Sequence, residues 1–319
     1  MHLEQEPWLS VIFPVHNGER WVGPALDSLV GQADPGLEIV VIDTSDGPGT
    51  RQIIDTYGDR LRLRYVDPDG ASGCSQKMNH GVRHADADHV AWLCQDDIWL
   101  PGRSAAVHNW LANDPDAVLH LAPSALVDPQ GRQVGLWHCP LQESEQPLDR
   151  ADLLEKLLVQ NFVSVISPIV RRDAWLAVGG IDLALWYTGD WDLWIKLARF
   201  GPVRFHDRVT GGFRIHNQSA TILGSADRNE FIAQHRIVLD RHVDALPSRQ
   251  ARAVRPLAEA SMRINVDLAA AAHGSAVALI RAAWSLVSLG PRGASRYLHF
   301  SRIVERSWPR LRAKLAGGL

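Results

Sequence analysis

The sequence predicts an α/β fold: a doubly wound, mainly parallel sheet flanked by helices, with an α-helical C-terminal extension. In the first hundred residues, short apolar runs alternate with segments of helical periodicity. This order is typical of parallel strands joined by right-handed helical crossovers. After about residue 225 the chain is rich in Ala and Arg, and its apolar residues recur at helical spacing. We therefore expect two units, a domain at 1–224 and a helical extension at 225–319.

The strands of the predicted sheet are short apolar runs that end at polar or turn residues. The first four runs are Trp8–Val15, Leu37–Asp43, Leu61–Val66 and His89–Cys94. Apolar residues at helical spacing predict helices between them, at 19–32, just after Gly49, and at 75–84. Later in the domain we expect strands at 117–121, 163–170 and 203–205, and helices near 151–160 and 191–200. The extension is expected to break into several helices at Pro247, Pro256, Gly274 and Gly290.

The composition is that of an ordinary globular protein. Of 319 residues, 46% are hydrophobic and 22% charged, which excludes a disordered or fibrous chain. The three cysteines are odd in number and have no metal-like spacing, so they indicate free thiols in a reducing compartment. The N-terminus lacks the pattern of a signal peptide, and the late apolar stretch Ala276–Leu289 is shorter than the about 20 residues that span a bilayer. We expect a cytoplasmic protein, free or peripheral at the inner face of the membrane.

The net charge of −3 is unevenly distributed. Residues 281–319 contain eight Lys or Arg and one acid, a net charge of +7, which leaves −10 on residues 1–280. Basic helices with apolar residues among the arginines are able to lie on an anionic membrane surface. A helical cap or a homodimer face would have the same pattern, so both interpretations stay open. We expect no nucleic-acid partner.

Polar clusters follow the predicted strands, where a doubly wound sheet binds its ligands. They are His16-Asn17, Asp43, Asp67 with Asp69, and the adjacent pair Asp96-Asp97. Two neighbouring carboxylates repel one another unless a cation lies between them, and Mg²⁺ or Mn²⁺ prefers oxygen ligands. The sequence therefore predicts a divalent metal at the acid pair. The alternative is a loop pair in which one acid caps the next helix.

Five segments, in order, resemble motifs of family 2 glycosyltransferases. They are VIFPVHNG (11–18), IVVIDTSDGPGT (39–50), GCSQKMNHG (73–81) with AWLCQDD (91–97), GDWDLWIKLARF (189–200) and FRIHNQSAT (213–221). The resemblance implies a GT-A fold and an inverting transfer from a nucleotide-diphospho-sugar, commonly a UDP-sugar. The acceptor would be a hydroxyl of a saccharide or lipid-linked molecule, in the biosynthesis of cell-surface polysaccharide or another glycoconjugate. A hexosyl- or N-acetylhexosaminyl-transferase is the implied class.

The resemblance also implies roles for residues of the donor site. Asp97 matches the acid that binds Mn²⁺ or Mg²⁺, and His216 matches a histidine that ligates the metal or contacts the diphosphate. Asp96 is expected to face the ribose or support the metal. The other implied donor residues are Pro14, Val15 and Asn17 along the nucleoside, Asp43 on the base, Asn79 over ribose and phosphate, and Arg214 on the phosphates. For Asp43 an Asx turn is the alternative.

Asp190 matches the catalytic base, which takes the proton of the attacking hydroxyl. A helix-capping or first-turn acid is the alternative, and the two roles are compatible. Of three nearby tryptophans, Trp191 and Trp194 have helical spacing and are expected in the core, whereas Trp186 is the candidate for stacking on the acceptor.

The sequence departs from the family pattern at Gly189, which replaces a glutamate, at Lys196, which replaces an arginine, and at Thr44, which replaces an acid. A QxxRW motif is absent, which argues against a processive polymer synthase. A nucleotidyltransferase and a catalytically inactive nucleotide-sugar-binding protein are the alternative functions.

Overall fold

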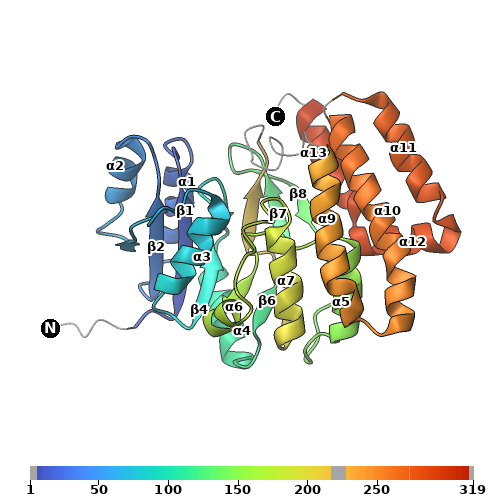
Figure 1. Ribbon diagram of the computed structural model, residues 1–319. Coiled ribbons are helices and arrows are strands. Elements are labelled where there is room, and N and C mark those ends of the chain that lie inside the picture. The colour runs from blue at the N-terminus through green and yellow to red at the C-terminus, as the bar shows by residue number, and fades with distance from the viewer. Residues whose placement is uncertain (1–5, 217–227, 273, 316–319) are drawn as a thin grey trace.

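The computed structural model describes residues 6–216, 228–272 and 274–315. A helical C-terminal unit lies beside a central sheet that is covered by helices (Figure 1). The expected boundary between residues 224 and 225 lies outside the described residues.

The main sheet has seven strands in the order β10-β6-β9-β4-β1-β2-β3. Their bounds are β1 (Leu9–Val15), β2 (Leu37–Asp43), β3 (Arg62–Tyr65), β4 (His89–Trp92), β6 (Leu119–Leu121), β9 (Ile169–Arg171) and β10 (Val203–Phe205). Neighbouring strands are parallel, except that β9 runs antiparallel to both β4 and β6. The predicted doubly wound, mainly parallel sheet is confirmed.

Helices cover both faces of this sheet. They are α1 (Val22–Val30), α2 (Gly49–Asp55), α3 (Cys74–His84), α4 (Arg103–Asn113), α5 (Arg150–Val159), α6 (Arg172–Ala177) and α7 (Gly189–Phe200). Successive residues of a strand point to opposite faces, so each central strand supplies two cores. On β1, for example, Ile12 belongs to the core that contains Trp194 of α7, whereas Val11 and Phe13 belong to the core under α1. Burial on both faces explains why these strands are continuous apolar runs.

A second, four-stranded sheet was not predicted. It has the order β5-β11-β7-β8, with β5 (Ile98–Trp99), β7 (Ser124–Val127), β8 (Gln133–Trp137) and β11 (Gly211–Arg214). Its strands have two to five residues, too few for a reliable period in the sequence. The expected strand at 163–170 is also wrong in extent, because only Ile169–Arg171 is a strand. The residues before it are buried but make turn hydrogen bonds, such as Ser167 N to Ser164 O at 3.1 Å.

The C-terminal unit consists of α9 (Arg228–His242), a short 3-10 helix (Val243–Ala245), α10 (Ser248–Ala272), α11 (Ala276–Val287), α12 (Gly290–Ser301) and α13 (Ile303–Leu315). The expected breaks near Pro247, Gly274 and Gly290 are confirmed, but α10 continues through Pro256. This unit shares one continuous core with the sheet domain, because Val238, Leu257 and Tyr297 belong to the same cluster as Trp194. No described helix has the length and apolar character needed to cross a bilayer.

The arginines of the basic tail bind mainly to the chain itself. Arg281 pairs with Asp267 at 3.1 Å, Arg302 with Glu305 at 3.2 Å, and Arg296 with Glu155. Arg306 lies over the ring of Trp137, 4.8 Å from its centroid. Several tail arginines are thus engaged in ion pairs within the chain, and both interpretations of the net charge, a membrane contact and a helical cap or homodimer face, stay predictions. Their charges stabilise the packing of α11, α12 and α13.

A buried carboxylate joins α9 to α7. Asp192 is fully buried, and its Oδ1 accepts hydrogen bonds from Arg241 Nη1 at 2.9 Å and His242 Nε2 at 2.8 Å. Lys196 Nζ lies 3.0 Å from Oδ2. Burial alone would raise the pKa of Asp192, but the hydrogen bond from His242 and the charges of Lys196 and Arg241 lower it to about 2.

We expect Asp192→Ala to destabilise the protein by about 3 kcal/mol, because three cationic or donor groups lose their buried partner. A group whose pKa is lowered on folding stabilises the protein above its ordinary pKa, here 3.8, and loses this effect as the pH falls toward 2. The free energy of unfolding measured in urea at neutral pH tests the prediction. The control is Asp152→Ala, which removes an exposed ion pair with Lys156 and should change stability by less than about 0.5 kcal/mol. Equal losses for the two variants would contradict it.

Candidate active site

The loops after β1, β2 and β4 meet at one edge of the main sheet and are held together by side chains. Gln95 binds the backbone of His16 twice, accepting from N at 2.8 Å and donating to O at 3.1 Å. Asn17 has a left-handed backbone, with φ of 47°, and its amide bonds both the carboxylate and the N–H of Asp46, at 2.8 and 3.0 Å. Three of the four predicted polar clusters, those after β1, β2 and β4, therefore form one rim. Gln95 was not predicted to have this role.

Pro14 and Val15 lie inside this rim rather than on its surface. Both are buried in β1, and their predicted place along the nucleoside stays a prediction. The carbonyl of Val15 accepts a hydrogen bond from Lys77 Nζ at 2.6 Å, and Lys77 also donates to Thr44 Oγ1 at 2.6 Å. Burial lowers the pKa of Lys77. Of the three residues predicted along the nucleoside, only Asn17 is exposed.

Asp43 ends β2 and forms an Asx turn. Its Oδ1 accepts hydrogen bonds from the backbone N and the hydroxyl of Ser45, at 2.9 and 2.6 Å. The structure thus contains the turn that was the alternative to base recognition. Because both bonds go to one oxygen, the turn does not exclude a hydrogen bond from a base to the other oxygen.

Asn79 and Arg214 both make several hydrogen bonds within the protein. The Asn79 amide bonds the backbone of Ile181 at 2.7 and 2.9 Å and the indole of Trp175 at 3.2 Å, so it ties α3 to the loop before α7. The Arg214 guanidinium is buried and donates to the carbonyls of Asp96, Asp128 and Pro129 at 2.6 to 3.0 Å. The predicted contacts of Asn79 with ribose and phosphate and of Arg214 with the phosphates stay predictions.

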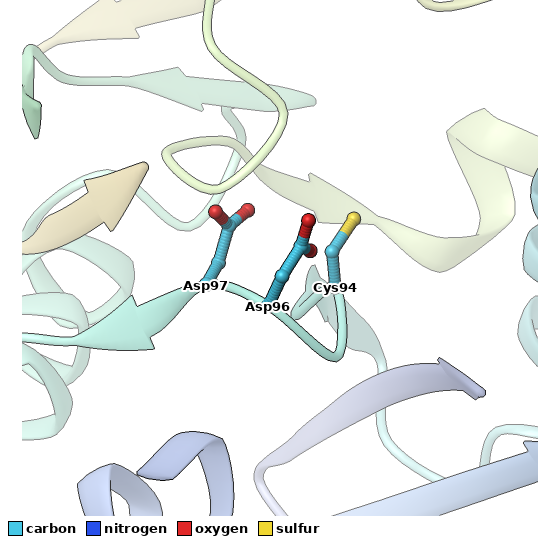
Figure 2. A group of neighbouring side chains, drawn as sticks. All are labelled: Cys94, Asp96 and Asp97. Atoms are coloured by element: carbon cyan, nitrogen blue, oxygen red, sulfur yellow. The ribbon is translucent and has the colours of Figure 1, made fainter. Parts of the chain in front are cut away.

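The acid pair lies in the loop between β4 and β5, together with Cys94. Candidate ligand atoms of Cys94, Asp96 and Asp97 lie within 4.8 Å of one another, and the three side chains project to the same side of the loop (Figure 2). Asp97 is 2% exposed, and its Oδ1 accepts a hydrogen bond from the backbone N of Arg214 at 2.9 Å. Its Oδ2 is buried and has no hydrogen-bond partner in the described chain. Burial and the neighbouring Asp96 raise the pKa of Asp97 well above its ordinary value.

This donor set fits a hard divalent cation. A buried carboxylate oxygen without a partner, beside a second carboxylate, is destabilising unless a cation or a proton neutralises it. Oxygen ligands suit Mg²⁺ and Mn²⁺. Cys94 is a poorer ligand, because its hydrogen bond with Cys74 and its burial raise the pKa of its thiol. Asp96 and Asp97 are therefore the residues of this group that would hold the metal.

His216 contacts Asp96 and lies outside this group of candidate ligands. Its Nε2 is 2.7 Å from Asp96 Oδ2, whereas its buried Nδ1 has no hydrogen-bond partner among the described residues. The antiparallel pairing of β11 with β5 brings the two together, since Gly212 pairs with Ile98. Close approach requires the glycine, because a Cβ at Gly212 would lie 2.8 Å from Ile98 Cγ1. In this structure His216 contacts Asp96, and its predicted contact with the metal or the diphosphate stays a prediction.

Asp190 is the second residue of α7, whose N-cap is Thr188. Asp190 therefore lies in the first turn of the helix, as the alternative interpretation allowed, but it is not the capping residue. Its Oδ2 accepts a hydrogen bond from Asn161 Nδ2 at 3.1 Å, and its Oδ1 from Trp191 N at 2.7 Å. Burial raises the pKa of Asp190 to about 6, against the lowering effect of these two bonds. A carboxylate with this pKa is mostly ionised at neutral pH and able to accept a proton.

Asn161 is a site residue that the sequence did not reveal. It follows α5, and Val163 N donates to its Oδ1 at 3.3 Å, which orients its amide N–H toward Asp190. The preceding Gln160 accepts hydrogen bonds from Ser261 and Asn265 of α10, both at 3.0 Å. The helical extension thus supports the loop that holds Asp190. Asn161 is one polar residue after an apolar helix, and no motif or spacing in the local sequence marks it as part of a site.

The structure gives a steric reason for Gly189. A Cβ at this position would lie 2.7 Å from Ile181 Cγ2 and 3.3 Å from the carbonyl of Asp182. A glutamate at this position, as in the motif that the segment resembles, would clash with Ile181. The close packing against Ile181 therefore explains the glycine.

The tryptophans near Asp190 divide as expected between core and surface. Trp191 and Trp194 are 5% and 0% exposed, which confirms their place in the core. Trp186 is 45% exposed, and its indole N–H bonds Glu230 of α9. A role of Trp186 in acceptor binding stays a prediction.

The chain is similar in sequence to known glycosyltransferases. Residues 10–168 match the family described as glycosyl transferase family 2. The chain is similar to uncharacterized glycosyltransferases of Rickettsia felis and Rickettsia typhi, with 25% and 27% identity over 67% of this chain. These alignments cover 35% and 66% of the two relatives, so the chain matches less than two thirds of either.

Two solved structures have a similar fold. S. aureus TarS 1–349 in complex with UDP-GlcNAc has 15% identity and a TM-score of 0.64, over 95% of this chain and 91% of TarS. The mannosyltransferase PcManGT from Pyrobaculum calidifontis, in complex with GDP-Man and Mn²⁺, has 19% identity and a TM-score of 0.55, over 94% of this chain and 87% of that protein. At these identities the likeness shows the shared fold.

Proposed function

The chain belongs to glycosyl transferase family 2, and we propose that it transfers a sugar, with inversion, from a nucleotide-diphospho-sugar to an acceptor hydroxyl. The proposed donor is a UDP-sugar, and the proposed group is a hexosyl or N-acetylhexosaminyl residue. The complexes of TarS with UDP-GlcNAc and of PcManGT with GDP-Man support a nucleotide-sugar donor. The proposed acceptor is a saccharide or a lipid-linked molecule of polysaccharide or other glycoconjugate biosynthesis.

The buried, partnerless Oδ2 of Asp97 is the observation that carries the proposal. It lies beside Asp96, at the rim where a doubly wound sheet binds its ligand. In the proposal Asp97 and Asp96 hold Mn²⁺ or Mg²⁺, which when bound neutralises negative charge on the departing diphosphate. His216 keeps the Asp96 carboxylate in place, and the backbone N–H of Arg214 holds Asp97. The Mn²⁺ in the PcManGT complex supports a divalent ion.

Asp190 is the proposed base. Its carboxylate takes the proton of the acceptor hydroxyl while that oxygen forms a bond to the anomeric carbon. The bond from this carbon to the diphosphate breaks on the opposite face, which inverts the configuration. Asn161 and the N–H of Trp191 fix both oxygens of the carboxylate, so the base is oriented before the acceptor arrives.

The proposal assigns the reaction to residues 1–224 and a supporting role to the helical extension at 225–319. The bonds from Ser261 and Asn265 to Gln160 favour such support, because Gln160 precedes the residue that holds Asp190. Trp186 is proposed as an acceptor contact on the basis of its exposure. A cytoplasmic location is proposed, as expected for three cysteines that are free thiols.

A thermal-shift screen tests the proposal. We expect UDP and UDP-sugars to raise the melting temperature in the presence of Mn²⁺, because a ligand of the folded state stabilises it. UMP, which lacks the second phosphate, is the matched control and should have a smaller effect. Slow Mn²⁺-dependent hydrolysis of the stabilising sugar nucleotide would then separate an enzyme from a binding protein. No shift with any nucleoside diphosphate or its sugars would overturn the proposal.

A further inference from the structure

Helix α11 exposes a large apolar face. Five of its apolar side chains are between 55% and 73% exposed: Val277, Leu279, Ile280, Trp284 and Val287. Their spacing places them on one side of the helix, which lies at the outer edge of the C-terminal unit (Figure 1). Surface apolar residues are ordinary when scattered singly, but a continuous apolar face marks a site of contact.

The face that α11 turns toward the protein is less bulky than the one it exposes. Its buried residues are Ala278, Ala282 and Ser285. A surface helix usually buries its large apolar residues and exposes polar ones. Apart from the partly buried Leu286, the arrangement here is reversed, so packing against the described residues does not explain the choice of Ile280 and Trp284. A partner outside the described chain would explain it.

The charges around this face are of one sign. No Asp or Glu occurs between residues 268 and 304. Arg281 is exposed at the edge of the apolar face, and Arg292 is exposed in the first turn of α12. The one acid that pairs with Arg281, Asp267, is buried. An apolar surface bordered by positive charge, without exposed carboxylates from its own helix or the next, complements an anionic lipid surface.

We propose that α11 lies flat in the interface of an anionic membrane, with Ile280, Trp284 and Val287 inserted among the lipids. Twelve residues form a helix of about 18 Å, enough to lie along a bilayer but not to cross it. Tryptophan favours the boundary between headgroups and acyl chains. A contact between two copies through this face would bring the positive borders of both copies together, which anionic lipid instead neutralises.

The proposed membrane contact differs from the one predicted for residues 281–319. The apolar face begins before that segment, at Val277, and most arginines described after Arg281 are engaged within the protein. Apolar insertion is therefore the main attraction, with charge as a supplement. The inference does not depend on the proposed reaction, because α11 is outside the active-site loops.

Co-sedimentation with vesicles tests the inference on the full chain. We expect the protein to bind vesicles of equal parts phosphatidylcholine and phosphatidylglycerol, and to bind pure phosphatidylcholine more weakly. The variant Ile280→Ser/Trp284→Ser should bind the mixed vesicles about tenfold more weakly or worse, because two large apolar groups are removed. The control Phe200→Ser changes a 48% exposed aromatic residue at the end of α7 and should bind like the wild type.

Three results would overturn the proposal. Absence of binding of the wild type to both vesicle types would do so, as would equal binding of the double variant and the wild type. The third is a wild-type dimer in light scattering that the double substitution converts to a monomer, without any vesicle binding. That result would assign α11 to a second copy of the chain. Unchanged thermal unfolding of the double variant in solution shows that a loss of binding is not a loss of fold.

Discussion

Asp190→Asn is expected to lower kcat for sugar transfer by about a hundredfold to ten-thousandfold, the usual contribution of a positioned general base. The asparagine is nearly the same size as the aspartate and can keep the bond from Trp191 N to its carbonyl oxygen. We therefore expect the Mn²⁺-dependent thermal shift with the donor to persist while transfer is lost. Steady-state kinetics together with thermal shift measure the two effects. Full transfer activity in this variant would exclude Asp190 as the base.

The pH dependence of transfer provides a second test of Asp190. Its pKa is raised to about 6, and only the ionised carboxylate accepts a proton, so kcat/KM should fall as the pH drops through about 6. Asn161→Ala removes a hydrogen bond that lowers this pKa, and should move the acid limb to higher pH. A general loss of packing would lower the rate at every pH without moving the limb. An unmoved limb would mean that Asn161 does not act through Asp190.

Asp97→Asn is expected to remove most Mn²⁺-dependent activity, by about a hundredfold or more, because one carboxylate of the metal pair becomes a neutral amide. We also expect that Mn²⁺ and UDP together no longer raise the melting temperature of this variant in a thermal-shift titration. The control is Asp86→Asn, which changes a 51% exposed acid at the surface and should leave both measurements unchanged. Unchanged metal dependence in Asp97→Asn would refute the assignment of the metal to this pair.

Without metal, Asp97→Asn should not lower the stability of the folded protein. A carboxyl group whose pKa is raised on folding favours the folded state below its ordinary pKa and loses this contribution as the pH rises through the folded-state value. At high pH the ionised, buried Asp97 is therefore destabilising unless a cation compensates it. We expect Asp97→Asn without metal to have an unchanged or higher melting temperature than the wild type. A large loss of stability would indicate a structural role instead.

The sequence by itself determined the main sheet and the location of the site. β1, β2 and β4 lie in continuous apolar runs that are visible without any period, and their alternation with helices leaves few topologies open. The strand ends then place Asp43 and the pair Asp96-Asp97 on one rim, because parallel strands end at the same edge. The place of Asp190 in the first turn of α7 also follows from a local signal, the helical spacing of Trp191 and Trp194.

Only the tertiary structure decided which residues meet across that rim. The contact of His216 with Asp96 depends on two short strands, β5 and β11. Their paired residues Trp99 and Gly211 are 112 positions apart in the sequence and meet only in the folded chain. The contact of Asn161 with Asp190 likewise depends on packing between α5 and α7. Such contacts join segments with no period of their own, so no local pattern encodes them.

The same reason explains the basic tail. Its net charge is visible in the sequence, but whether an arginine faces solvent depends on acids far along the chain, such as Glu155 opposite Arg296. Likewise, the apolar residues of α11 have the spacing of a buried face, and only the packed structure shows that Ile280 and Trp284 point outward. Periodicity predicts that a helix has an apolar face, whereas the neighbours available to cover it are decided by the tertiary fold.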